Sequence, residues 1–104
     1  MKTSLFSFVF LMILSHVSVA QDKKWDSTFR PNNWALKAEL FKSFPNTKKD
    51  IFFFGNSITA GVDWNELLDE KRARNRGISG DITFGVLQRL DEVIEGKPKK
   101  VFIL

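Results

Sequence analysis

Residues 51–54 read Ile-Phe-Phe-Phe, an unbroken apolar run that residues 55–57, Gly-Asn-Ser, end abruptly. An apolar run without polar alternation is typical of a strand that is covered on both faces, as in a parallel sheet. A second run of this kind, Val-Phe-Ile-Leu at 101–104, predicts another buried strand. The order of elements that results is strand, helix, strand, helix, strand. It predicts an α/β domain with parallel pairing.

Helices are expected on both sides of the first strand. One is predicted over 34–44, with Asn33 as a candidate cap and Pro45 as its stop signal. Its apolar side chains fall near one face: Leu36, Leu40, Phe41 and Phe44. A short helix is expected over 64–70, and the charged stretch after it leaves room for a short strand around 73–76.

A longer helix is expected to lead into the last strand. Asp81 or Thr83 is its candidate cap, and it runs to about residue 95, where Gly96 and Pro98 are stop signals. Helical spacing predicts that it turns these side chains inward: Val86, Leu87, Leu90, Val93 and Ile94.

Residues 1–20 have the pattern of a signal peptide. Lys2 supplies a positive charge, residues 4–17 are mostly apolar, and residues 18–20, Ser-Val-Ala, put small side chains where signal peptidase needs them. The apolar run is shorter than the about 20 residues that span a bilayer, so no stable membrane insertion is expected after cleavage. The alternative is a buried N-terminal helix. We expect a secreted or periplasmic protein in which residues 21–49 form an N-terminal arm and helix.

Cleavage of this leader after Ala20 is a testable prediction. N-terminal sequencing of the exported protein is expected to begin at Gln21, because small residues precede that position. A cytoplasmic product that keeps Met1 would contradict it.

The composition excludes several classes of protein. The chain of 104 residues is 43% hydrophobic and 27% charged, which rules out a wholly disordered or collagen-like chain. The net charge of +4 is spread over 16 basic and 12 acidic residues, and we expect no nucleic-acid partner. Without cysteine, disulfides, thiolate metal sites and a cysteine nucleophile are excluded. The one histidine, His16, lies in the leader, so residues 21–104 hold no Ser-His pair.

Ser57 is a candidate nucleophile because of where it stands. It follows a buried strand directly, after Gly55 and Asn56, two residue types that allow a tight turn. A serine in this place exposes its hydroxyl at the carboxyl edge of the sheet. Its own backbone N–H points at whatever the hydroxyl attacks, as an oxyanion site requires. The alternative is an ordinary turn at the end of a strand.

Residues 77–81, Gly-Ile-Ser-Gly-Asp, form a second glycine-bearing turn between an expected strand and a helix. Because Gly80 has no Cβ, its N–H can approach a ligand oxygen closely. A phosphate-binding loop is the competing idea, but neither of the usual glycine-rich phosphate motifs is present. Neither turn identifies a function by itself.

Taken together, the two turns resemble the SGNH hydrolases, also called the GDSL family. Residues 54–59, Phe-Gly-Asn-Ser-Ile-Thr, resemble the first signature block of that family, and residues 75–83, Asn-Arg-Gly-Ile-Ser-Gly-Asp-Ile-Thr, resemble the second. The helix that follows and the strand at 100–104 match the lead-in to the third block. The resemblance covers residues 50–104.

The resemblance implies a flavodoxin-like three-layer α/β/α fold and ester hydrolysis through an acyl-enzyme. Ser57 would be the nucleophile, and the N–H groups of Ser57 and Gly80 would be two oxyanion donors. The family adds an asparagine in a G-x-N-D block and a histidine in a D-x-x-H block, and this sequence contains neither block. We therefore expect residues 50–104 to be the N-terminal part of such a domain, truncated after about its third strand. Expressed alone, residues 21–104 are expected to be inactive and poorly soluble.

One residue inside the first block departs from the family. Asn56 stands where the family usually has an aspartate, which keeps the shape of the turn but removes a charge beside the nucleophile. Asn56 and Trp64 are candidate residues of a substrate pocket, although core packing is an equal alternative for Trp64. Trp25 and Trp34 are interpreted as anchors of the N-terminal segment.

Two sets of charged residues are candidates for other roles. Three carboxylates are expected to be solvated helix charges: Asp63, Asp69 and Glu70. A metal site is the less favoured interpretation, because their spacing matches no ligand motif. A basic cluster is interpreted as an exposed loop, with contact to an anionic substrate as the alternative: Lys71, Arg72, Arg74 and Arg76.

The sequence thus predicts a secreted serine esterase that acts on a small-molecule or glycan ester. The acyl or acetyl ester class comes from the resemblance alone. A non-catalytic carbohydrate-binding module on the same fold, or an inactive remnant of it, is the alternative. A serine mechanism needs no cofactor and no metal, and none is expected. The oligomeric state and the ester that is cleaved stay open.

Overall fold

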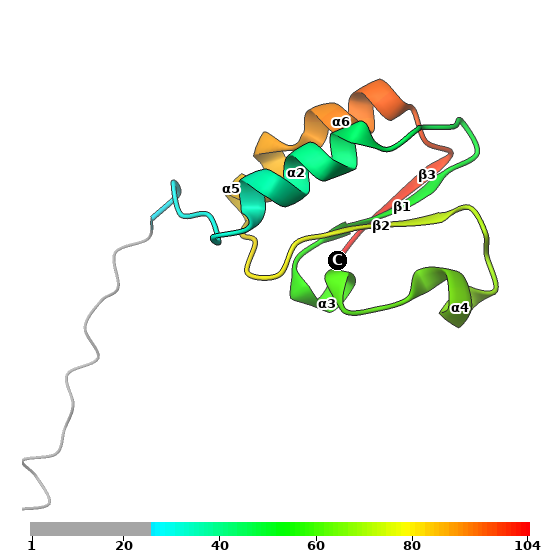
Figure 1. The fold of residues 1–104 in the computed structure, drawn as a ribbon, viewed down its shortest axis with the longest axis horizontal. Helices are drawn as coiled ribbons and strands as arrows, with labels where there is room; N and C mark the ends of the chain where they lie inside the picture. The colour runs from blue at the N-terminus through cyan, green and yellow to red at the C-terminus, as the bar shows by residue number, and fades with distance from the viewer. Residues whose placement is uncertain (1–25) are drawn as a thin grey trace, which may run out of the picture.

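The computed structural model describes residues 26–104, which form an open sheet of three parallel strands with helices. The strands are β1 (Ile51–Gly55), β2 (Ala73–Gly77) and β3 (Lys100–Ile103), in the order β2-β1-β3 (Figure 1). The α/β class and the parallel pairing predicted from the sequence are confirmed. The proposed leader and Trp25 lie outside the described residues. Within 26–104, no helix has both the length and the apolar character needed to cross a membrane.

The helices of the described part connect and flank the strands. They are α2 (Trp34–Ser43), α3 (Ser57–Ala60), α4 (Trp64–Leu68), α5 (Thr83–Gln88) and α6 (Leu90–Gly96). In Figure 1, α2, α5 and α6 lie along one side of the sheet, and α3 and α4 lie on its other side. An ion pair of 3.0 Å between Lys42 Nζ of α2 and Asp91 of α6 joins helices of the first group.

β1 is the central strand and is covered on both faces, as its apolar run predicts. Phe52 and Phe54 are fully buried on one face, beneath the guanidinium groups of two arginines. Phe53 points to the opposite face, because neighbouring side chains of a strand alternate. There it stacks on Trp64 of α4, with ring centroids 4.1 Å apart.

β3 is an edge strand that is far more exposed than its sequence predicts. Ile103 is 68% exposed, and Phe102 is also exposed although it stacks on Phe53 with centroids 5.2 Å apart. The strand predicted at 101–104 is therefore confirmed, but its predicted burial is wrong. Among the described strands, β3 pairs with β1 alone, and apolar content does not distinguish a central strand from an edge strand.

α2 confirms the helix expected over 34–44, but only part of its predicted apolar face is buried. Ala38 and Phe41 face the interior. The other members of that face are exposed, Leu36 to 74%: Leu36, Leu40 and Phe44. Asn33 occupies the N-cap position without forming a side-chain cap hydrogen bond.

The long helix expected up to about residue 95 is instead two short helices, which meet at Arg89. Its buried positions are Gly85, Arg89, Glu92 and Gly96. Leu87 and Ile94, which the spacing places inside, are exposed, Ile94 to 70%. The buried residues do share one helix face. Because that face consists of glycines and paired charges, apolar spacing did not find it, and the other predicted residues are only half-buried: Val86, Leu90 and Val93.

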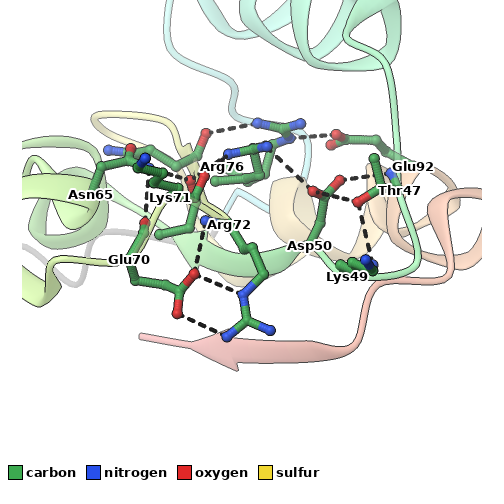
Figure 2. A network of polar contacts seen from close by, with 12 residues as sticks. Thr47, Lys49, Asp50, Asn65, Glu70, Lys71, Arg72, Arg76 and Glu92 are labelled. Carbon is green, nitrogen blue, oxygen red and sulfur yellow. Dashed lines mark hydrogen bonds and ion pairs between the residues drawn. The ribbon is translucent and has the colours of Figure 1, made fainter.

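Arg76 of β2 extends this charged interior. Its side chain is buried and pairs with the buried carboxylate of Glu92 in α6 (Figure 2). The guanidinium also lies over the ring of Phe52, 4.7 Å from its centroid. An exposed loop, the interpretation drawn from the sequence, is therefore wrong for Arg76.

The neighbouring arginines are paired as well. Arg72 Nε lies 2.7 Å from Glu70 Oε1 (Figure 2). Hydrogen bonds from the side chain and the backbone N–H of Arg72 lower the pKa of Glu70 to about 2. Arg74 Nε lies 3.4 Å from the buried carboxylate of Asp50. Within the described residues, most of the positive charge of this segment is therefore matched by carboxylates of the same domain.

Substitution of Gly77 tests the close approach of β2 to α3. A Cβ at Gly77 would overlap the backbone of Ala60, whereas a Cβ at Gly61 would meet only the Ser57 carbonyl oxygen at 3.3 Å. Overpacking against backbone costs about 1–3 kcal/mol, so we expect Gly77→Ala to lower the free energy of unfolding by that amount. Gly61→Ala, the control, should stay within about 0.5 kcal/mol. Equal losses in chemical denaturation would contradict the close approach.

Candidate active site

The two predicted signature turns meet at the carboxyl edge of the sheet. β1 and β2 are parallel and end in register, with Gly55 opposite Gly77. The carbonyl oxygen of Gly55 accepts a hydrogen bond from the N–H of Ile78, at 3.0 Å. Ser57 follows the first strand end and Gly80 follows the second, so both lie at the edge where open α/β sheets bind ligands.

Ser57 is the first residue of α3, and it is exposed. Asn56 caps this short helix, since its side-chain oxygen accepts a hydrogen bond from the N–H of Ile58 at 3.1 Å. An aspartate could accept the same bond, so Asn56 preserves the turn without the charge. Among residues 26–104, neither the hydroxyl nor the backbone N–H of Ser57 donates a hydrogen bond.

Gly80 lies in a tight turn that the N–H of Asp81 closes by donating to the Ile78 carbonyl oxygen at 3.1 Å. Its φ of +80° is a conformation that favours glycine. A Cβ here would lie 3.3 Å from Cβ of Pro31, so the N-terminal arm packs beside the turn. The Gly80 N–H has no acceptor within the described part of the chain. The edge of the sheet thus offers two unpaired backbone donors, a chemistry that suits an oxygen anion.

Asp81 anchors this turn from the interior. Its Oδ1 accepts from the N–H of Ile82 at 2.9 Å, and its Oδ2 accepts from Nε of Arg89 at 2.9 Å. Neither Asp81 nor Thr83 caps α5 as predicted, because Ile82 occupies the N-cap position. The buried Asp81 carboxylate serves an ion pair instead.

Arg89 is the residue that sequence reasoning missed. Burial lowers its pKa, while the hydrogen bond and charge of Asp81 act in the opposite direction. An available signal was Gly85, one helical turn earlier, where a Cβ would overlap the Asp81 carboxylate. A glycine and an arginine on one helix face leave room for a buried charged pair.

A hollow of about 300 Å³ lies beside the site, between the ends of β1 and β3 and the start of α5. Asn56 lines it, but its lining does not include Ser57, Gly80 or Trp64, and a substrate role for Asn56 stays a prediction. Trp64 stacks on Phe53 and donates its Nε1–H to the Thr59 carbonyl oxygen at 3.0 Å. These contacts make Trp64 part of the packing between α4 and the sheet, and a substrate role for it stays a prediction.

Trp34 and Asp63, two of the other candidates, have structural partners. Arg30 lies over the ring of Trp34, 5.4 Å from its centroid, so Trp34 contacts the N-terminal arm as expected. Asp63 caps α4 by accepting from the N–H of Glu66 at 3.2 Å. In the part of the chain that the structure describes, no group of three or more metal-ligating side chains is present.

No protein-family model matches this chain, and no curated protein matches it.

Substitution of Gly80 tests the geometry of the second turn. Alanine at φ +80° is strained by about 1–2 kcal/mol, so Gly80→Ala should lower the free energy of unfolding by that amount. Gly80→Asn brings the same Cβ close to Pro31, but asparagine tolerates positive φ, so its loss should be smaller. Chemical denaturation of both variants checks this. Equal stability of the two would show that backbone strain does not matter here.

Proposed function

We propose that this chain supplies the first part of a secreted serine ester hydrolase of the SGNH type. The observation that carries the proposal is the pair of unpaired donors: the N–H groups of Ser57 and Gly80 follow the ends of two adjacent parallel strands. The exposed hydroxyl of Ser57 belongs to the same turn as one of those donors. The two motifs quoted from the sequence support the same assignment.

In the proposed reaction, Ser57 Oγ attacks the carbonyl carbon of the ester. The carbonyl oxygen becomes negative and accepts hydrogen bonds from the N–H groups of Ser57 and Gly80. The alcohol then leaves, and water hydrolyses the acyl-enzyme that remains. A serine needs a base to take its proton. We propose that this base is a histidine of a D-x-x-H block outside this sequence, as the resemblance implies; it takes the proton of Ser57 and gives it to the oxygen of the leaving alcohol.

The flavodoxin-like three-layer fold belongs to the same proposal. The strand order β2-β1-β3 and the parallel pairing are compatible with it. Helices α2, α5 and α6 on one side of the sheet, with α3 and α4 on the other, support it further (Figure 1). A small-molecule or glycan ester as substrate follows from the resemblance and from the proposed export of the chain.

The test uses the protein translated from the complete reading frame, with p-nitrophenyl acetate as substrate. Ser57→Ala is expected to reduce kcat/KM by at least about 10³-fold, because the nucleophile is lost. Ser79→Ala is the control: it removes an exposed hydroxyl from the neighbouring turn at the same edge, and its activity should be unchanged.

A second readout identifies the nucleophile directly. A fluorophosphonate should label the wild-type protein at Ser57 and leave Ser57→Ala unlabelled, as shown by peptide mass spectrometry. Undiminished turnover by Ser57→Ala would overturn the proposal. Sugar binding without turnover in the wild type would favour a carbohydrate-binding module instead.

A further inference from the structure

Arg89 has an unusual place for an arginine. It stands at the break between α5 and α6, where its φ of −106° and ψ of 17° interrupt the helix. Its side chain nevertheless points inward and is only 2% exposed. The guanidinium lies over the ring of Phe54, 4.3 Å from its centroid. A charged group this deeply buried requires partners that satisfy its N–H donors.

Those partners come from three separate segments. Nε donates to Oδ2 of Asp81 at 2.9 Å. Nη1 donates to the carbonyl oxygen of Arg76, in β2, at 2.6 Å. Nη2 donates to the carbonyl oxygen of Gly55, the last residue of β1, at 2.8 Å. One planar side chain thus binds the end of each neighbouring strand and the turn that follows the second.

Two of these acceptors adjoin the proposed oxyanion donors. Gly55 precedes Ser57 by two residues, and Asp81 directly follows Gly80. We propose that Arg89 is a positioning residue, which sets the placement of the Ser57 turn relative to the Gly80 turn. The inference rests on the proposed function, and it assigns Arg89 no contact with substrate.

Arginine is suited to this task in a way that lysine is not. Its planar fork holds donors in fixed directions, so three acceptors can be bound at once. The Lys ammonium is a compact point charge that would keep the attraction to Asp81 but could not reach all three acceptors with the same geometry. Arg89→Lys therefore separates the charge from the geometry.

Arg76 provides a matched control. Its side chain is also 2% exposed, and it also pairs with a buried carboxylate, that of Glu92. Its Nη1 donates to the carbonyl oxygen of Asn75. The Arg76 side chain holds neither Gly55 nor Asp81, so Arg76→Lys perturbs a buried ion pair without loosening either turn.

The experiment compares Arg89→Lys with Arg76→Lys in the protein from the complete reading frame. The first readout is hydrogen exchange, measured by NMR, at one bonded amide of each turn. Ile58 donates to Asn56 and Asp81 donates to Ile78. We expect Arg89→Lys to raise exchange at both amides by about tenfold or more relative to Arg76→Lys.

The second readout is hydrolysis of p-nitrophenyl acetate. An oxyanion donor is worth about 10²–10³ in rate, so Arg89→Lys should lower kcat by about 10²-fold and change KM little. Arg76→Lys should lower the melting temperature but keep kcat. Equal effects of the two variants on exchange and on kcat would overturn the positioning role.

The two proposals can fail separately. If Ser57→Ala keeps full turnover, the esterase assignment falls, and exchange at Ile58 and Asp81 still decides whether Arg89 holds the turns. If Arg89→Lys does not fold, Asp81→Asn replaces it, since it keeps an acceptor for Ile82 and removes the charge that faces Arg89. Faster exchange at Ile58 in that variant than in Arg76→Lys supports the role, and unchanged exchange at Ile58 overturns it.

Discussion

Two buried arginines organise one face of the sheet. Arg76 comes from β2 and Arg89 from the break between α5 and α6, and each meets a buried carboxylate, Glu92 or Asp81. Removing one partner of a buried pair costs about 3–5 kcal/mol, because the other charge is left alone in the interior. A shift of α5 or α6 along β2 would break one of these ion pairs and would therefore cost that free energy. The position of α5 and α6, which connect β2 to β3, depends on these ion pairs.

Close contacts at two glycines also fix how the helices pack against the sheet. At Gly85, the absence of a Cβ leaves space for the Asp81 carboxylate, and at Gly77 it leaves space for the backbone of Ala60. The first contact lies on the side of the sheet that holds α5, and the second involves α3. Close backbone contacts of this kind therefore occur on both sides of the sheet.

This arrangement separates the anchoring residues from the proposed reactive groups. Ser57 and Gly80 are exposed, whereas the neighbouring groups that hold them, the Gly55 carbonyl and the Asp81 side chain, are buried and bound by Arg89. Reactive groups keep a productive geometry when the residues behind them are locked by packing and hydrogen bonds. The Ser57 and Gly80 turns meet that requirement, because each has an exposed residue next to a buried group that Arg89 binds.

The sequence by itself determined the class of fold, because apolar runs such as 51–54, bounded by turn residues, are typical of strands in a parallel sheet, and 51–54 does form the covered strand β1. It also placed the turns that carry Ser57 and Gly80 after two strand ends, since small and glycine residues that follow an expected strand are a local turn signal. Only the tertiary structure decided which helix face is buried and that β3 lies at the edge of the described sheet. It alone revealed Arg89, whose acceptors Gly55 and Asp81 lie 34 and 8 residues away. Local pattern records apolar spacing, but a buried charge is tolerated only where distant partners converge on it, and that convergence exists only in the folded chain.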